Sequence, residues 1–252
     1  MDSITISLIA FAFIFGGALL GILLHVRLPV NHLNSESRDV VKLGMGLVGT
    51  VAALVLGLLV ASAKGSYDTQ NTELTEMSAK LVLLDRVLAH YGPETNEERD
   101  LLRKFVVDAL ENMWSKNLFS PSPPSGGPSV GNEIIYDKLQ ELSPKDERQR
   151  SLQAQASSMV IELGKTRWLM FAQRAASVSM TLLIVLIFWL TIIFISFGLF
   201  APRNITVTAS LFFSALAVSG AILLILEMST PYSGLIQVSS APLRAALSHL
   251  GQ

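Results

Sequence analysis

Three glycines in the segment GMGLVG, residues 44–49, match the G-x-G-x-x-G fingerprint of dinucleotide-binding sites. That fingerprint binds a pyrophosphate only where a strand leads into the N-terminus of a helix, because free backbone amides point at the phosphate there. In this sequence the motif lies inside an uncharged apolar segment, Leu43–Ala63, that is long enough to cross a membrane. We therefore reject a nucleotide site and expect no cofactor.

The other residue types that could carry chemistry are scattered along the chain. The four histidines, His25, His32, His90 and His249, lack the spacing of metal ligands, and the chain contains no cysteine. No Ser/His/Asp arrangement and no G-x-S-x-G elbow is visible. The sequence therefore predicts no metal site and no catalytic residues, and an enzyme is not expected.

The composition instead indicates a membrane protein. Of the 252 residues, 50% are hydrophobic and 15% are charged, whereas a soluble domain carries roughly 25% charged residues. The net charge of -1 gives no basic footprint for nucleic acid. Four apolar segments each reach the ~20 residues that span a bilayer: Ile4–Leu24, Leu43–Ala63, Ala175–Ala201 and Ile205–Leu226. The fold class predicted is all-α, a polytopic membrane protein with four transmembrane helices and a helical extramembrane insert between the second and third.

This prediction divides the chain into spans 1 and 2 (1–63), the polar insert (64–174), and spans 3 and 4 with a C-terminal tail (175–252). The insert begins with apolar residues at alternating spacings of three and four, typical of one helix packing on another: Leu74, Met77, Leu81, Leu84, Leu88 and Tyr91. Gly92-Pro93 should end that helix. A second helix is predicted around Leu102–Met113, a loop over 120–131, a short helix near 133–142, and a last helix from Lys145 that runs into the third span.

Small residues recur at every fourth position in the second span: Gly49, Ala53, Gly57 and Ala61. Small residues at this spacing let helix backbones approach closely in lipid. The contact could lie within one subunit or between subunits, and the pair Gly17 and Gly21 in the first span allows the same two interpretations. Thr50, Leu54 and Leu58 lie about 100° from the small residues on a helix, where they could line a narrow apolar constriction.

The fourth span ends on Glu227, followed by Pro231, Tyr232 and Gly234. We expect Glu227 to meet water, since a carboxylate in hydrocarbon costs about 3 kcal/mol or more. Tyr232 is placed like an interfacial aromatic anchor. Pro231 cannot continue the helix, and Gly234 can adopt turn conformations that other residues avoid.

Two stretches in this order, AALVLGLLVASAKGSYD (52–68) and LEMSTPYSGLIQVS (226–239), resemble the bestrophin-like domain family of bacterial four-span proteins. The resemblance covers nearly the whole chain and marks six family-signature residues: Tyr67, Asp68, Glu227, Pro231, Tyr232 and Gly234. The family's usual form has an acidic residue two positions before the proline. Ser229 stands there in this chain, and the nearest acid is Glu227.

The chain is similar, more distantly, to the bestrophins, which are pentameric anion channels. The segment LVLGLLV, residues 54–60, looks like their pore-neck pattern, although the proline and phenylalanines of that neck are missing. The resemblance implies that Thr50, Leu54 and Leu58 form the neck of a homo-oligomer, a pentamer, that conducts small anions. It also implies that Pro231 and Tyr232 pack against the insert and fix it relative to the pore.

With four spans, both termini and the insert share one side of the bilayer. Six basic residues lie near the spans on that side (Lys64, Lys80, Lys165, Arg167, Arg174 and Arg244), against Arg27, Arg38, Lys42 and Arg203 opposite. This bias favours a multi-pass protein of the inner (plasma) membrane with a cytoplasmic insert and termini. A homo-oligomeric anion channel is the leading functional hypothesis. The alternative is a non-conducting membrane scaffold, or a partner-binding protein that acts through its insert.

Overall fold

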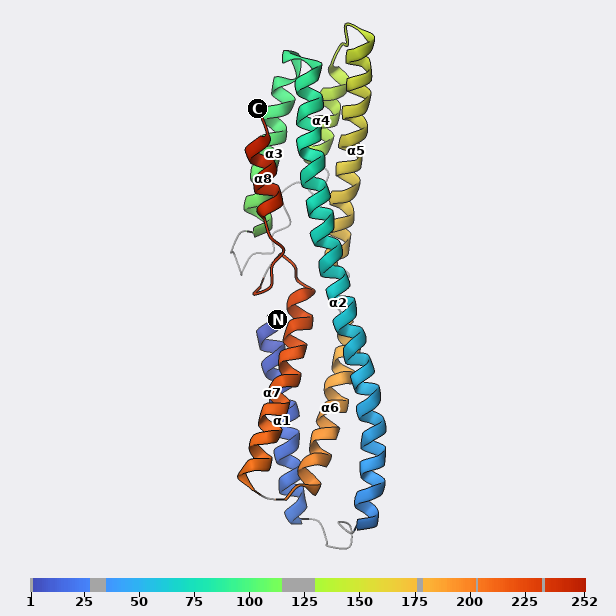
Figure 1. Ribbon diagram of the computed structural model, residues 1–252, viewed down its shortest axis with the longest axis vertical. Coiled ribbons are helices and arrows are strands. Elements are labelled where there is room, and N and C mark those ends of the chain that lie inside the picture. The colour runs from blue at the N-terminus through green and yellow to red at the C-terminus, as the bar shows by residue number, and fades with distance from the viewer. Residues whose placement is uncertain (1, 28–34, 115–129, 176–178, 203, 233) are drawn as a thin grey trace. The chain divides into compact units, whose positions relative to one another are not determined.

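The computed structural model describes residues 2–27, 35–114, 130–175, 179–202, 204–232 and 234–252. The regular elements in these ranges are helices (Figure 1). In chain order they are α1 (Ser3–Arg27), α2 (Ser35–Tyr91), η2 (Pro93–Thr95), α3 (Asn96–Trp114), α4 (Val130–Glu141), α5 (Glu147–Ala175), α6 (Met180–Phe200), α7 (Ile205–Met228) and α8 (Ala241–His249). Four of them, α1, α2, α6 and α7, are long and apolar enough to cross a membrane. The predicted all-α, four-span architecture is confirmed.

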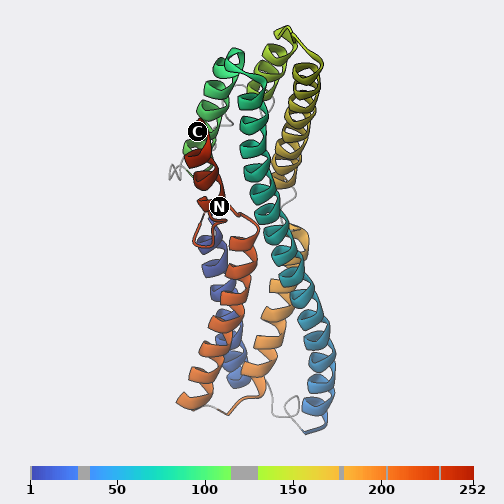
Figure 2. The same ribbon diagram turned by 45° about the horizontal axis from the view of Figure 1, so that its top comes forward.

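The chain forms two compact units. Unit 1 comprises Met1–Ser66 and Ser177–Thr230, and unit 2 comprises Tyr67–Ala176 and Pro231–Gln252. Helix α2 runs without a break from Ser35 to Tyr91, so its first part belongs to unit 1 and its second part to unit 2 (Figure 2). The sequence-based division placed residues 231–252 with the last two spans, whereas the structure groups them with the insert.

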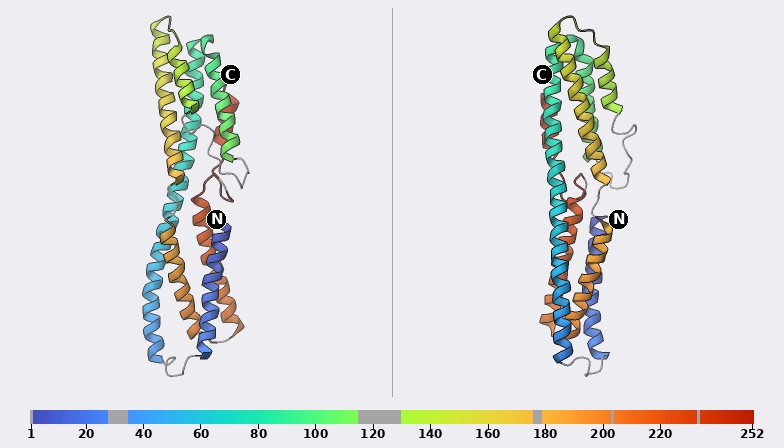
Figure 3. Two further views of the ribbon diagram at one scale, coloured as in Figure 1. Left: turned by 180° about the vertical axis from the view of Figure 1, so that it is seen from behind. Right: turned by 90° about the vertical axis from the view of Figure 1, so that its right-hand side faces the viewer.

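In unit 1, α1 packs against both α6 and α7 (Figure 3). The backbones of α1 and α6 approach closely because both helices carry glycines at the contact. A Cβ at Gly17 would lie 3.0 Å from Thr191 O, and a Cβ at Gly21 would lie 2.8 Å from Leu199 N. A Cβ at Gly198 of α6 would overlap Ala18 O. The pair Gly17 and Gly21 therefore makes a helix contact within one chain, one of the two arrangements left open by the sequence.

In unit 2, the six residues of the predicted α2 seam, Leu74 to Tyr91, are all buried. The first five of them, Leu74 to Leu88, pack with Leu102 and Val106 of α3, and with residues of α4 and α5, into one apolar core. Gly92 ends α2 with a φ of 138°, a conformation that side chains with a Cβ disfavour. The helices predicted for the insert are thus present. Residues 120–129 of the predicted loop lie outside the described residues, and α4 begins at Val130.

The prediction that the last insert helix continues into the third span is wrong. Helix α5 ends at Ala175 and α6 begins at Met180. Ser179 has a ψ of 105°, which is outside the helical region and makes it the N-cap residue of α6. The sequence does not mark this break, because residues 174–181 contain no proline or glycine.

Candidate functional site

The three predicted neck residues lie on an open face of α2. Leu54 and Leu58 are 71% and 65% exposed, and Thr50 is also exposed. Leu43 and Leu47 extend this face toward the start of the helix. We call the side chains of Leu43, Leu47, Thr50, Leu54 and Leu58 the open face of α2. The structure therefore brings the predicted neck residues together on one side of one helix.

The chain's own helices cover α2 less than they cover the other spans. In the most apolar 18-residue window of α2, 11% of the residues are buried, against 33% in α1, 39% in α6 and 33% in α7. The side of α2 that is buried carries Ala52, Leu59 and Ala63, which join the apolar core of unit 1. The open face is thus the side that a single chain leaves to lipid or to another molecule.

The small residues beside the open face are likewise uncovered. Ala53, Gly57 and Ala61 are exposed, and Gly49 is partly exposed. A Cβ built at Gly49 or at Gly57 would meet nothing within 4 Å, in contrast to Gly21 and Gly198 in the α1–α6 contact. Since small residues at four-residue spacing are a device for close helix packing, space for such packing exists along α2.

Thr50 adds no free hydroxyl to the open face. Its Oγ1 donates a hydrogen bond of 2.9 Å to Gly46 O, one turn earlier in the same helix. Threonine commonly satisfies its hydroxyl in this way inside helices. The surface over residues 43–58 is therefore apolar in effect. Several copies of it around an axis would make a narrow ring that water wets poorly.

Four of the six family-signature residues, Tyr67, Pro231, Tyr232 and Gly234, lie at or against the loop after α7 in unit 2. The Tyr67 hydroxyl of α2 donates to Gln237 O at 3.2 Å. Pro231 O accepts a 2.7 Å hydrogen bond from Val238 N, which closes the loop after α7. Gly234 has a φ of 92°, as the predicted turn requires. The loop that follows the fourth span is thus held against α2 of the insert.

Tyr232 is not an exposed interfacial anchor, so that prediction is wrong. Its ring is buried in the core of unit 2 and contacts the Trp114 ring edge-on, with centroids 5.7 Å apart. Trp114 Nε1 donates a 2.9 Å hydrogen bond to Val238 O in the same loop. The expected packing of Tyr232 against the insert is observed. The sequence did not point to Trp114, because that residue is distant along the chain.

The acidic signature residues differ in environment. Asp68 is exposed on α2, and its backbone carbonyl accepts the Thr72 hydroxyl at 2.9 Å. Glu227 was expected to meet water, but it is 3% exposed in the last turn of α7. Its main-chain carbonyl accepts a hydrogen bond of 3.1 Å from Thr230 N as the helix ends. Glu227 is therefore part of a buried helix end.

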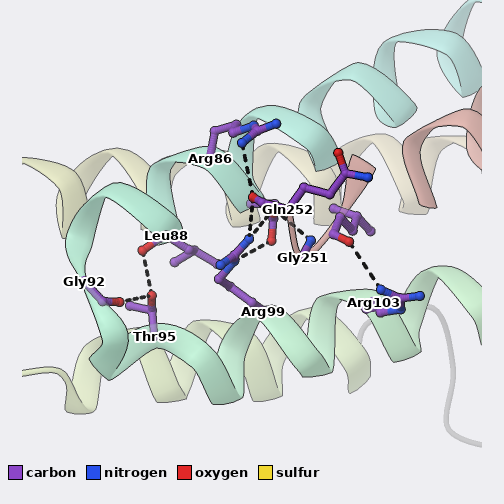
Figure 4. A network of polar contacts seen from close by, with 10 residues as sticks. Arg86, Leu88, Gly92, Thr95, Arg99, Arg103, Gly251 and Gln252 are labelled. Atoms are coloured by element: carbon purple, nitrogen blue, oxygen red, sulfur yellow. Dashed lines mark hydrogen bonds and ion pairs between the residues drawn. The ribbon is translucent and has the colours of Figure 1, made fainter. Parts of the chain in front are cut away.

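A buried ion pair in unit 2 was also missed from the sequence (Figure 4). Asp85 of α2 is 1% exposed and accepts two hydrogen bonds from Arg99 of α3, 2.8 Å from Nε and 2.9 Å from Nη2. These hydrogen bonds raise the pKa of Arg99 above its usual value. The same Asp85 carboxylate accepts a hydrogen bond of 3.2 Å from Gly251 N. This pair ties α2 to α3 and to the end of the chain.

Two further arginines complete this cluster, which we call the C-terminal clamp (Asp85, Arg86, Arg99 and Arg103). Arg86 Nη1 and Arg99 Nη2 donate to Gln252 O at 3.2 and 3.3 Å, and Arg103 Nη1 donates to Leu250 O at 3.3 Å. Beside them, Leu243 and Leu250 are buried in the core of unit 2. The clamp therefore fixes the segment after α8 to the insert.

One histidine has a structural role at the far end of unit 1. His25 Nδ1 lies 2.6 Å from Leu199 O, so it is the nitrogen that carries the proton and donates to this carbonyl at the end of α6. His25 and Arg38 line an open hollow together with the segment 200–202 that ends α6. His90 and His249 are exposed, and His32 lies outside the described residues. His25 thus caps the end of α6.

Comparison with solved structures supports the fold. Two variants of a bacterial bestrophin homologue from Klebsiella pneumoniae, each with one substitution, are similar to this chain. The first has a TM-score of 0.65 at 11% identity and covers 94% of this chain and 97% of its own. The second has a TM-score of 0.57 at 12% identity and covers 96% of this chain and 97% of its own. At this identity the likeness shows the fold alone.

The family is established by sequence. No curated protein matches the chain. The model of the bestrophin-like domain matches residues 12–243, which include the open face of α2, the insert and the loop after α7. The chain is a membrane protein that belongs to the bestrophin-like domain family.

Proposed function

We propose that the chain assembles into a homo-oligomeric ion channel whose narrowest part is the open face of α2. The observation that carries this proposal is the contrast between the two sides of that helix. Ala52, Leu59 and Ala63 are buried in the chain's own core, whereas Leu54 and Leu58 are largely exposed. At 100° per residue the two groups lie on roughly opposite sides of the helix.

The uncovered small residues supply a means of assembly. Gly49, Ala53, Gly57 and Ala61 flank the open face and have room for a neighbouring backbone. If they pack against the next copy of the chain, closed rotational symmetry brings the open faces of all copies to the ring axis. The bestrophin resemblance implies five copies.

Such a ring makes a hydrophobic gate. The isobutyl groups of Leu54 and Leu58 from every copy would meet near the axis. A narrow apolar ring holds water poorly and blocks ions until it widens. Conduction is therefore low in the resting protein, and the neck is the barrier.

The direction of insertion follows from the basic residues. We propose the inner membrane with the insert and both termini in the cytoplasm, supported by the six-to-four bias of basic residues. Within the insert unit, the loop after α7 packs on Trp114 and Tyr67. As permeant species, the resemblance implies small anions.

The test is ion flux through the purified protein in liposomes. Leu54→Ala with Leu58→Ala shortens both neck side chains and should raise flux several-fold above the native protein. The matched control is Leu19→Ala with Leu23→Ala, two exposed leucines at the same spacing on α1, which should leave flux unchanged. An iodide indicator reports anion flux, and a sodium indicator, read in parallel, reports cation flux.

The scaffold alternative gives a different result. It predicts that the double-alanine protein assembles normally and passes neither anions nor cations above the level of empty liposomes. That outcome would replace the channel proposal with a scaffold that acts through the insert.

A further inference from the structure

A hollow of about 490 Å³ lies in unit 1 where α1 ends and α2 begins. His25 of α1, Arg38 of α2 and residues 200–202 at the end of α6 line it. Its volume is within the range of pockets that hold small ligands, about 300–1,000 Å³. None of the lining residues that the structure describes is acidic. We call this cavity the basic hollow.

The acidic neighbours of Arg38 along α2 lie on other sides of the helix. At 100° per residue, position 39, an aspartate, is about 100° from Arg38, and position 36, a glutamate, is about 160° away. Lys42 is only about 40° away and one turn further on, so it shares the side of Arg38. Among the residues that the structure describes, no carboxylate forms an ion pair with Arg38. The charge of Arg38 is therefore available to an anion from outside the chain.

The end of α6 would by itself oppose an anion here, because the carbonyl groups at a helix C-terminus carry partial negative charge. His25 offsets this effect, since its Nδ1 donates to Leu199 O at 2.6 Å. Nε2 is the ring nitrogen that remains for a ligand, and it donates to an anion when the ring carries a second proton. Arg38 stands in the first turn of α2, where the helix dipole is also positive. The basic hollow thus favours negative charge.

The basic hollow lies at the depth of lipid headgroups. His25 directly follows Leu24, the last residue of the first apolar segment, and Ala201 ends the third. Arg38 stands five residues before Leu43, where the second apolar segment begins, a rise of about 7 Å along the helix. The headgroup layer on each side of the hydrocarbon core is about 5–7 Å thick. A lipid phosphate would therefore lie level with His25 and Arg38.

We infer that the basic hollow binds a phosphate group, held by the Arg38 guanidinium and the His25 imidazole. The phosphate belongs to an anionic phospholipid or is a free phosphate ion, since both present the same oxygen atoms to these donors. A guanidinium suits this ligand because its N–H groups can make two parallel hydrogen bonds to phosphate oxygens. Such binding does not require ion conduction, so it is independent of the proposed channel.

Binding to the purified full chain in detergent tests the inference. Native mass spectrometry measures the affinity for phosphatidylglycerol, and calorimetry measures the affinity for inorganic phosphate. Arg38→Gln should weaken binding of the ligand roughly tenfold, because it removes charge-assisted hydrogen bonds. Diacylglycerol with the same acyl chains lacks the phosphate, so Arg38→Gln should leave its binding unchanged. A loss of affinity for phosphatidylglycerol identifies a lipid headgroup as the ligand, and a loss for inorganic phosphate alone identifies the free ion.

The matched control is Arg27→Gln, which removes a charge from an exposed residue at the same end of α1 that does not line the basic hollow. It should change either affinity by less than about twofold. Arg38→Lys keeps the charge but loses the paired donors, so its affinity should fall between those of the native protein and Arg38→Gln. If Arg38→Gln left both affinities unchanged, or if the native protein bound neither probe, the inference would be overturned. An equal loss from Arg27→Gln would also overturn it, because it would show general attraction to a basic surface.

Discussion

The C-terminal clamp should make Asp85 one of the costliest positions to change in the insert. Asp85→Asn keeps the side-chain shape but removes the charge that faces Arg99. The Asp85 side chain is 1% exposed and that of Arg99 is 17% exposed, so neither group is well solvated. Removing one partner of a buried pair costs about 3–5 kcal/mol, because the other charge stays buried without compensation. Arg99 retains some water and its bond to Gln252 O, which favours the lower value, about 3 kcal/mol.

For a chain of this size, each kcal/mol shifts the melting temperature by about 2–4 °C. We therefore expect Asp85→Asn to lower the melting temperature of the detergent-solubilised protein by about 6–12 °C. Tryptophan fluorescence reports the transition, since Trp114 and Trp168 lie in the same unit. Asp100→Asn is the control, since it removes the same charge from an exposed position beside Arg99. Its expected cost is within about 0.5 kcal/mol. If both variants had the same melting temperature as the native protein, the stabilising role of the clamp would be refuted.

Two glycine variants separate contacts within the chain from contacts between chains. Gly198→Leu places a side chain where Ala18 O already lies, so it should prevent α1 from packing on α6 and abolish recovery of folded protein in detergent. Normal recovery and melting of Gly198→Leu would contradict the close α1–α6 contact. Gly57→Leu meets open space in one chain, so the monomer should fold while oligomers dissociate on native gels. Unchanged oligomer size would show that Gly57 lies outside the subunit contact.

The membrane helices and the α2 seam could be predicted from the sequence because their signals are local. Apolar windows of about 20 residues identify the spans. The alternating spacing from Leu74 to Tyr91 identifies a buried face, and Gly92-Pro93 marks its end. The open face with Leu54 and Leu58 could also be placed, since helical register alone puts these residues on one side.

The missed features depend on contacts between residues far apart in the chain. Gly198 contacts Ala18, and Asp85 contacts Arg99. The residues that flank each of these positions in the sequence do not predict which partner it contacts. The misjudged positions have a related cause. Tyr232 and Glu227 resemble residues at a membrane surface, but the insert core covers the Tyr232 ring, and Glu227 is buried in the final turn of α7.

The central claim is that the open face of α2 turns toward a symmetry axis, and cysteine cross-linking in the membrane tests it most directly. The chain has no cysteine, so a single introduced one gives no background. Leu58→Cys and Ile184→Cys place thiols at positions that are 65% and 64% exposed in one chain, on α2 and on α6. A disulfide needs Cβ atoms about 3.5–4.5 Å apart, which only a narrow neck would provide between copies. The account predicts covalent dimers on oxidation of Leu58→Cys and none from Ile184→Cys. Monomers from Leu58→Cys, with dimers from Ile184→Cys, would contradict it.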